Sequence, residues 1–196
     1  MGVLKMIKNI VLDIGGVLFD DSKANIEKVL NKKCDSIYKK AYGGGFKDCI
    51  LGKQTVQEHI DSLKDSEEYE SVKYILDKSN LKETYPIIKN NFEYVKKLKN
   101  SNYKLYLLTN ITEDSYMYIN DLININTIFD GGIYSYQEHL AKPNHDIYKL
   151  LIEKFNLNKE ETIFFDDKEK NVIAAREVGI QAVVFHSIED IKKELG

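Results

Sequence analysis

Five short apolar runs, separated by segments with helical spacing, constrain what this chain can fold into more than any other feature of the sequence. Each run is bounded by turn residues, and the runs occupy residues 7–12, 103–109, 128–135, 162–165 and 181–185. Runs such as Ile10-Val11-Leu12 are apolar without alternation, which is typical of strands covered on both faces in a parallel sheet. Helices are expected at 113–122, 145–155, 169–178 and 188–195, and from residue 85, with Thr84 as its cap and Pro86 in its first turn. This alternation predicts a doubly wound parallel α/β sheet.

One long segment interrupts the alternation of strands and helices. Residues 21–84 contain helical stretches at 25–31, 55–63 and 67–76, but no convincing strand. Within the segment, Gly43-Gly44-Gly45 predicts a flexible joint. A loop of this length without structure is uncommon in a compact domain. We therefore expect a Rossmann-like core of residues 1–20 and 85–196, with residues 21–84 inserted after the first strand as a small helical cap domain.

Composition excludes several classes of protein. No apolar run approaches the roughly 18 residues that a membrane-spanning helix needs, and no signal peptide is visible, so a cytoplasmic protein is expected. The formal net charge is −3 without a stripe of Lys and Arg, which argues against a nucleic-acid partner. Cys34 and Cys49 are too few for a disulfide scaffold or a four-ligand zinc site, and we expect free thiols. A chain of 196 residues can bury a hydrophobic core large enough to fold without disulfides or structural metals. We expect a monomer or a small homo-oligomer.

Carboxylates follow the first and the fourth apolar runs, at the point where each run ends. Asp13 closes the first run and Gly15-Gly16 come directly after it. In open α/β sheets the functional crevice lies outside the carboxyl ends of the strands. Glycines there let backbone N–H groups approach an anion, although Asp13 taken alone fits a helix-capping residue equally well. Asp166 and Asp167 follow the fourth run, and two adjacent carboxylates are costly to place together unless a cation such as Mg²⁺ compensates them.

Two further polar motifs stand at the ends of predicted elements. Thr109-Asn110 ends the second run, ahead of the helix expected from Glu113. Thr109 can donate a hydrogen bond to an anionic oxygen, or either residue can serve as a helix N-cap. Lys142-Pro143 precedes the helix expected at 145–155, where a lone lysine ordinarily faces solvent and a proline is common. Taken singly, neither motif decides between a structural and a functional role.

In their order and spacing, the four motifs resemble those of the haloacid dehalogenase superfamily, a large group of aspartate-nucleophile phosphohydrolases. The superfamily's motifs look like Asp13 to Val17, Thr109-Asn110, Ser135 with Lys142-Pro143, and Asp167 with Asn171. The resemblance runs from residue 7 to residue 185, and the helical insertion lies where that superfamily carries its smaller cap domain. Within the superfamily, the chain is most similar to bacterial sugar-phosphate phosphatases, glucose-1-phosphate phosphatases among them. The resemblance implies a small phosphorylated metabolite as substrate.

The resemblance also implies a mechanism and a metal site. Asp13 would attack phosphorus and form an aspartyl-phosphate, which water then hydrolyses. Mg²⁺ would be held by Asp13, the backbone carbonyl of Gly15 and Asp167, with Asp166 bound directly or through water. A divalent cation offsets the repulsion between a carboxylate and a dianionic phosphate.

The remaining site residues are expected to bind the substrate. By the same resemblance, Thr109, Asn110 and Lys142 would hold the phosphoryl oxygens. Lys142 would also keep the nucleophile ionised and aimed. In the helical insertion, Phe46 and Lys53 are expected to face the substrate.

Gly15 departs from the pattern of the superfamily's phosphatases. Most of them carry a second Asp two residues after the nucleophile, which protonates the leaving group and then activates water. A glycine can do neither, and general acid–base catalysis is typically worth about 10²–10⁴-fold. Asp20, Asp21 and His139 are the candidates for a substitute acid. An easily displaced leaving group, or little catalysis at all, would also explain Gly15.

Two other functions are compatible with the sequence. The superfamily's dehalogenases also lack the second Asp, but they resemble one another in a cap arginine, and residues 21–84 contain none. The Asp166-Asp167 pair also favours a metal-dependent reaction, which dehalogenation is not. A weakly active binding or regulatory protein would explain Gly15, but not the presence of both Asp13 and Lys142. We therefore prefer the hypothesis that the protein is a phosphatase.

Overall fold

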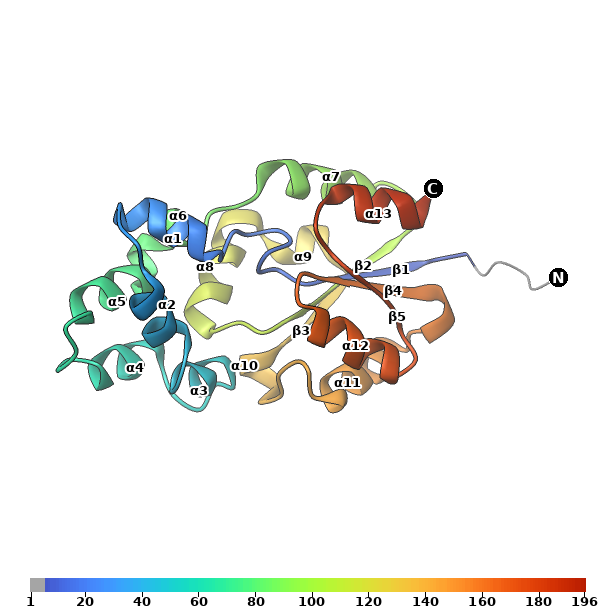
Figure 1. Ribbon diagram of the computed structural model, residues 1–196. Helices are drawn as coiled ribbons and strands as arrows, with labels where there is room; N and C mark the ends of the chain where they lie inside the picture. Colours follow the sequence, from blue (N-terminus) through green and yellow to red (C-terminus); the bar gives the residue numbers. More distant parts are fainter. Residues whose placement is uncertain (1–5) are drawn as a thin grey trace.

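A five-stranded parallel sheet forms the centre of the computed structural model, which describes residues 6–196 (Figure 1). The strands are β1 (Asn9–Leu12), β2 (Lys104–Thr109), β3 (Gly131–Tyr134), β4 (Thr162–Asp166) and β5 (Gln181–Val184). They lie in the order β3-β2-β1-β4-β5, and every neighbouring pair is parallel. In the central strand β1, Val11 pairs with Tyr106 on one side and with Phe164 on the other. The predicted doubly wound, Rossmann-like sheet is confirmed.

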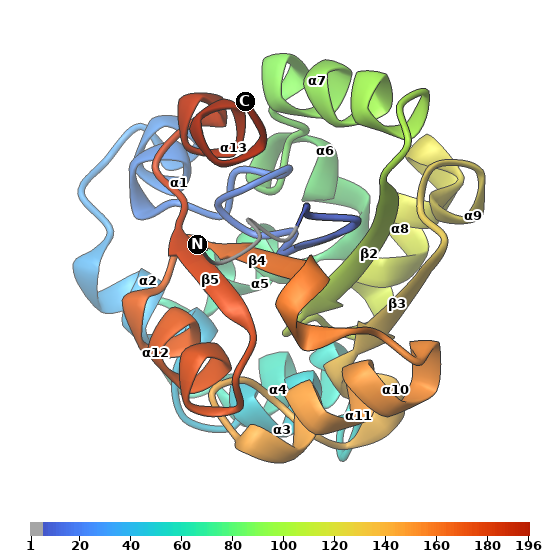
Figure 2. The ribbon, with the colours of Figure 1, turned by 90° about the vertical axis from the view of Figure 1, so that its right-hand side faces the viewer.

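Helices cover both faces of the sheet, as Figure 2 shows. They are α7 (Lys89–Lys99), α8 (Glu113–Ile123), α9 (Ile125–Ile128), α10 (Ser135–Glu138), α11 (His145–Phe155), α12 (Glu169–Glu177) and α13 (Ile188–Leu195), with a 3₁₀ turn η2 (Lys159–Glu161) before β4. Because side chains alternate along a strand, Ile10 and Leu12 pack into one core with α7, α8, α9 and α13. Val11 packs into a second core with α11 and α12. None of the helices in residues 6–196 has both the length and the apolarity needed to cross a bilayer.

The segment between β1 and α7 forms a helical module with a hydrophobic core of its own. Its helices are α1 (Lys23–Leu30), α2 (Asp35–Tyr42), α3 (Phe46–Ile50), α4 (Val56–Ser62), α5 (Tyr69–Leu76), η1 (Lys78–Asn80) and α6 (Leu81–Thr84). Helices α2, α3 and α6 and the 3₁₀ turn η1 are additional to those expected from the sequence. The buried residues of this third core all lie between Ile26 and Leu76, and they include Cys34 and Cys49, which are free thiols as predicted. Residues on both sides of Gly43–Gly45 contribute to it, so these glycines lie within one packed module.

Two short linkers join the helical module to the sheet, and they run side by side. Phe19 and Ile87 form an antiparallel bridge. The backbone N–H of Asp20 donates to the Pro86 carbonyl at 2.9 Å, and that of Ile88 donates to the Leu18 carbonyl at 2.8 Å. This pairing holds residues 86–88 extended, so the expectation of a helix with a Thr84 cap and Pro86 in its first turn was wrong. Thr84 ends α6 instead, and α7 begins only at Lys89.

The module also touches the core at a second place, between the α3–α4 loop and α10. The Ser135 hydroxyl donates to the Ile50 carbonyl at 2.7 Å, and Nδ1 of His139 lies 2.8 Å from the Leu51 carbonyl oxygen. Gly52 has a φ of 64°, and a Cβ added there would lie 2.2 Å from the Tyr136 carbonyl oxygen. Only a glycine fits this approach of two backbones.

We predict that Gly52→Ala destabilises the protein more than Gly44→Ala does. Both glycines have positive φ, and a side chain in that conformation costs about 1–2 kcal/mol. A Cβ at Gly44 meets nothing within 4 Å, whereas one at Gly52 collides with the core. The additional loss for Gly52→Ala should be about 1–3 kcal/mol in urea unfolding. Equal losses for the two variants would show that the α3–α4 loop is not docked on α10.

Candidate active site

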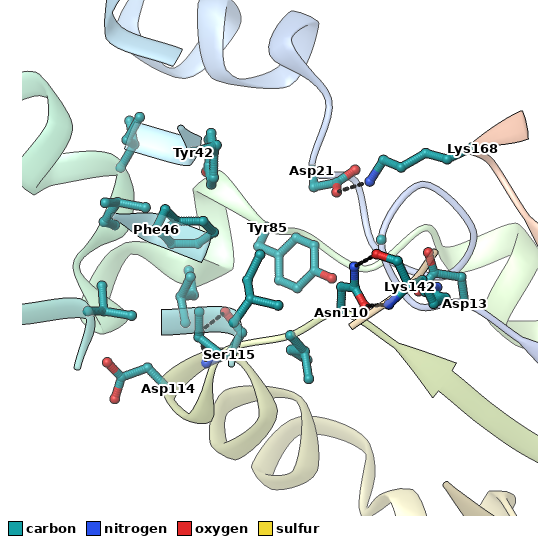
Figure 3. A pocket seen from close by; sticks show the side chains of 18 of the residues that line it. Asp13, Asp21, Tyr42, Phe46, Tyr85, Asn110, Asp114, Ser115, Lys142 and Lys168 are labelled. Carbon is teal, nitrogen blue, oxygen red and sulfur yellow. Dashed lines mark hydrogen bonds and ion pairs between the residues drawn. The ribbon is translucent and has the colours of Figure 1, made fainter. Parts of the chain in front are cut away.

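The polar motifs of the sequence meet at one end of an elongated cavity of about 300 Å³ (Figure 3). Asp13 follows β1, Thr109 ends β2 and Asp166 ends β4. These three strands are adjacent, and their carboxyl ends meet at the point where the strand order reverses, as is usual for sites in open α/β sheets. Asp13 and Lys142 line the cavity, whose far wall comes from the helical module.

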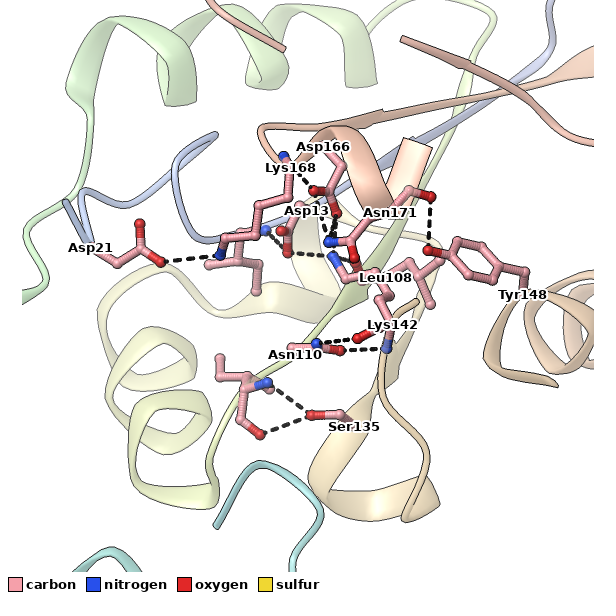
Figure 4. Close-up of polar contacts among 12 residues, drawn as sticks. Asp13, Asp21, Leu108, Asn110, Ser135, Lys142, Tyr148, Asp166, Lys168 and Asn171 are labelled. Carbon is pink, nitrogen blue, oxygen red and sulfur yellow. Dashed lines mark hydrogen bonds and ion pairs between the residues drawn. The ribbon is translucent and has the colours of Figure 1, made fainter. Parts of the chain in front are cut away.

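Lys142 is the centre of the polar contacts, as Figure 4 shows. Its side chain is fully buried, and Nζ lies 2.9 Å from Asp13 Oδ1 and 2.6 Å from Asp166 Oδ2. Nζ also donates to the Leu108 carbonyl at 2.8 Å. A buried ammonium requires such partners, because an unpaired charge in the interior is very costly. The lysine therefore faces the predicted nucleophile rather than solvent.

The two carboxylates that share Lys142 differ in their proton affinity. Burial raises the pKa of Asp13 to about 7, and Asp166 adds to this effect while Lys142 opposes it. Burial also acts to raise the pKa of Asp166, but Lys142 and the N–H groups of Lys168 and Asn171 outweigh it and lower that pKa. Asp166 is therefore the permanent counter-charge of Lys142.

Three carboxylates could hold a metal ion at this end of the cavity. Oxygen atoms of Asp13, Asp166 and Asp167 lie within 4.8 Å of one another. Within the described part of the chain, Asp167 Oδ1 is buried without a hydrogen-bond partner, as expected for an oxygen atom that coordinates a cation. Both oxygens of Asp166, by contrast, accept hydrogen bonds from Asn171, and one of them faces Lys142. A Cβ at Gly16 would lie 2.6 Å from Asp167 Cγ, so the glycine makes room for this carboxylate.

Thr109 and Asn110 follow Leu108, whose carbonyl accepts a hydrogen bond from Lys142, but they differ in the hydrogen bonds that their side chains make. Thr109 is buried, and its Oγ1 has no hydrogen-bond partner among the described residues. The Asn110 side chain is held on both sides, since Nδ2 donates to the Lys142 carbonyl at 2.9 Å and Oδ1 accepts from the Lys142 N–H at 2.8 Å. Asn110 therefore fixes the backbone that carries Lys142, an arrangement that the sequence does not reveal.

Asp21 occupies the space beside Gly15. A Cβ added to Gly15 would lie 2.6 Å from Asp21 Oδ2 and 3.4 Å from the Tyr85 hydroxyl oxygen. Lys168 Nζ lies 3.9 Å from the same carboxylate oxygen. Burial raises the pKa of Asp21, and Lys168 opposes this effect. Gly15 is not among the positive-φ glycines, so Asp21 rather than backbone strain limits a side chain at this position.

The other candidates from the sequence are distributed differently around the cavity. Phe46 lines it, as does Asp21. Lys53 instead lines a neighbouring hollow, together with Gly52 and Tyr136. His139 is exposed and contacts the Leu51 carbonyl rather than the cavity.

Sequence reasoning missed several residues that line the cavity. Lys168 directly follows the Asp166-Asp167 pair, and this neighbouring positive charge was a signal that could have identified it. Tyr38, Tyr42 and Tyr85 carry no such signal, because tyrosines are frequent throughout the chain.

The chain is similar to known hydrolases over most of its length. The family model described as haloacid dehalogenase-like hydrolase matches residues 7–179. The chain is 24% identical over 191 residues to the Phosphorylated carbohydrates phosphatase of Thermotoga maritima, a match covering 93% of this chain and 88% of that protein. It is 33% identical over 86 residues to the Sesquiterpene phosphatase astK of Aspergillus oryzae, and this match covers 44% of each protein. The chain thus spans less than half the length of astK.

The fold is shared with a solved structure as well. The HAD family enzyme bt-2542 from Bacteroides thetaiotaomicron superposes with a TM-score of 0.75 at 23% identity, covering 98% of this chain and all of that one. At this identity the likeness concerns the fold alone. The family match, however, spans β1 to β4 and the residues around Lys142, and the chain therefore belongs to the haloacid dehalogenase-like hydrolases.

Proposed function

We propose that this protein is a Mg²⁺-dependent phosphatase that hydrolyses a small phosphomonoester through an aspartyl-phosphate on Asp13. The observation that carries the proposal is the 2.9 Å contact between Asp13 and the buried ammonium of Lys142. A carboxylate that approaches a phosphate dianion is repelled, and a fixed positive charge beside it offsets the repulsion. Asp13 and Lys142 line the cavity, and the unpartnered hydroxyl of the buried Thr109 stands at the end of the adjacent strand β2.

Asp13, Asp167 and the Gly15 carbonyl are the groups that would hold Mg²⁺, with Asp166 direct or through water. The unpartnered Oδ1 of Asp167 supports this assignment, whereas the four hydrogen bonds and ion contacts of Asp166 favour an indirect role. Bound there, Mg²⁺ supplies positive charge against the charge that develops on the phosphoryl group. The fold neighbour bt-2542 has been crystallised with magnesium and inorganic phosphate.

The chain's own residues divide the reaction into two steps. An oxygen of Asp13 forms a bond to phosphorus while the ester P–O bond breaks, and the electron pair leaves with the alcohol oxygen. Lys142 and Thr109 hold the phosphoryl oxygens, and Asn110 positions Lys142 for this task. Asp21 donates a proton to the departing alcohol oxygen. Water then attacks the aspartyl-phosphate, with Asp21 accepting its proton, and phosphate and the free Asp13 carboxylate are regenerated.

The helical module of residues 21–84 acts in this proposal as a cap over the cavity. The paired linkers at residues 18–20 and 86–88 are its hinge, because they are the continuous chain between the module and the sheet. Closure of such a cap excludes water from the reacting groups.

The names of the relatives suggest two kinds of substrate. The name of the Phosphorylated carbohydrates phosphatase supports a sugar phosphate, which is also what the sequence motifs suggest, whereas the name of the Sesquiterpene phosphatase astK supports the phosphate of a sesquiterpene. Either substrate is a small phosphorylated metabolite.

We predict that removal of divalent cations abolishes phosphatase activity. Protein treated with a chelator should release no phosphate from a phosphomonoester and should recover on addition of Mg²⁺, because the carboxylate cluster otherwise repels the dianion. Phosphate release can be followed colorimetrically, with Ca²⁺ as a comparison cation of larger radius. Full phosphate release in excess chelator would exclude the metal role, whereas no phosphate release with or without Mg²⁺ would favour a dehalogenase-type reaction.

We predict that Asp13→Asn abolishes turnover without unfolding the protein, because an amide does not attack phosphorus. The loss should exceed about 10³-fold for a nucleophile. The beryllium fluoride adduct, a mimic of the aspartyl-phosphate, should form on wild-type Asp13 and be absent from the variant in crystal structures. Activity of Asp13→Asn within tenfold of wild type would rule out the covalent step.

We predict that Asp21→Asn slows alkyl phosphates more than aryl phosphates. An alkoxide needs a proton as it departs, whereas p-nitrophenolate needs little, so the alkyl ester should lose about 10²–10⁴-fold and the aryl ester less than tenfold. Asp20→Asn is the matched control, since Asp20 accepts from the Ser22 N–H and does not line the cavity. Equal losses with both esters would show that Asp21 is not the proton donor.

A further inference from the structure

The helices of the module form an apolar wall in the half of the cavity away from Lys142. The residues that helices α2 to α6 contribute are all aliphatic or aromatic, and they include Tyr42, Phe46, Ile50, Val56, Ile75 and Leu81. The charged residues that line the cavity come from the sheet, its helices and the linker instead. Figure 3 shows the wall around Tyr42 and Phe46 on one side of Tyr85, and Asp13 and Lys142 on the other. The cavity therefore has a charged end at Asp13 and Lys142 and an apolar wall on the side of the helical module.

The aromatic side chains of this wall are held in place by one another. The ring centroids of Tyr38 and Tyr42 are 4.7 Å apart, and those of Tyr42 and Phe46 are 5.3 Å apart with perpendicular planes. The Tyr38 hydroxyl donates to the Asp21 carbonyl at 3.0 Å, so it is already engaged. The aromatic row thus offers ring surface and the hydroxyl of Tyr42 to whatever fills the cavity.

A polyhydroxylated substrate does not suit such a wall. Each hydroxyl that leaves water without finding a partner costs about 1–3 kcal/mol. An apolar group gains about 0.8 kcal/mol for each CH₂ that it buries. The wall therefore discriminates against a sugar and in favour of a hydrocarbon of similar size.

The far end of the cavity also limits the charge of the ligand. Figure 3 places Asp114 at the side opposite Asp13 and Lys142. A carboxylate there repels a second phosphate or a carboxylate on the substrate. A cavity of about 300 Å³ is at the small end of the range for ligand sites, which suits one ring or a short branched chain.

We propose that the substrate is the monophosphate ester of a neutral, apolar alcohol, of the arylalkyl or short isoprenoid class, whose hydrocarbon part lies against the helical module. The inference rests on the proposed phosphatase function, because the charged end of the cavity is assigned to the phosphate. It goes further in that the helical module selects the alcohol by apolar contact.

The test compares esters that share the same kind of leaving group. Phenethyl phosphate, citronellyl phosphate and glucose-6-phosphate are all primary alkyl esters, so differences in rate report on the alcohol and not on its departure. With Mg²⁺, kcat/KM should be at least about tenfold higher for the two apolar esters. Equal or faster hydrolysis of glucose-6-phosphate would overturn the inference and leave the phosphatase function standing.

Substitutions at two positions in the wall locate the preference. Phe46→Asn should lower kcat/KM for phenethyl phosphate about tenfold or more and change glucose-6-phosphate little, whereas Phe46→Leu should keep most of the preference. Val56→Thr preserves the shape of the side chain, adds one hydroxyl and should reduce the preference several-fold even if Phe46→Asn fails to fold. An unchanged ratio of the esters in Val56→Thr and in a folded Phe46→Asn would contradict the role of the wall, as would the loss of the preference in Phe46→Leu.

A binding measurement separates this inference from the proposed reaction. Asp13→Asn can be titrated with phenethyl phosphate and with glucose-6-phosphate while the tyrosine fluorescence is followed. Tighter binding of phenethyl phosphate without turnover by the wild type would support the apolar site and refute the phosphatase function. Equal binding of both esters would refute the apolar site, whatever the wild type hydrolyses.

Discussion

The active-site end of this fold depends on the burial of one ammonium group between two carboxylates. Lys142 Nζ contacts Asp13, Asp166 and the Leu108 carbonyl, and so it connects the ends of β1, β2 and β4. None of these charges could be buried alone, because removing one partner of a buried pair costs about 3–5 kcal/mol. Asn110, directly after β2, forms two hydrogen bonds with the backbone of Lys142. The same contacts that hold the strand ends together therefore also orient Asp13, the proposed nucleophile.

The sheet and most of its helices could be predicted because they depend on local patterns. Continuous apolar runs become buried parallel strands wherever helices cover both faces, and α11 and α13 span the same residues as expected. The start of α7 could not be predicted in this way. Pro86 is a common first-turn residue, but here its carbonyl accepts from Asp20, which is far away in sequence. Hydrogen bonding to a segment so distant in sequence overrides the local preference of these residues for a helix.

The candidate site shows a similar division between what spacing reveals and what it conceals. The strand ends bring Asp13, Asp166 and Asp167 together because parallel strands end at one edge. Spacing does not show where a side chain points. Asp21 is separated from Gly15 by a loop, and only the folded loop places its carboxylate where a side chain of residue 15 would stand. The apolar wall is equally hidden, because its residues come from several helices whose packing sets which side chains face the cavity.

With the proposed substrate, the two halves of the cavity would act on one another through the water that the substrate displaces. An apolar alcohol that packs against the wall would expel water from the cavity and so lower the local dielectric constant. The attraction between Lys142 and a phosphate grows as the dielectric constant falls. Contacts made far from phosphorus would thus raise the rate at phosphorus. The same loss of water would remove the solvent molecules that could otherwise protonate a departing alkoxide. A carboxyl group at the boundary of the two halves then becomes necessary, and Asp21 lies there, beside Gly15 and Tyr85. A substrate too small to displace the water would lose rate as well as affinity.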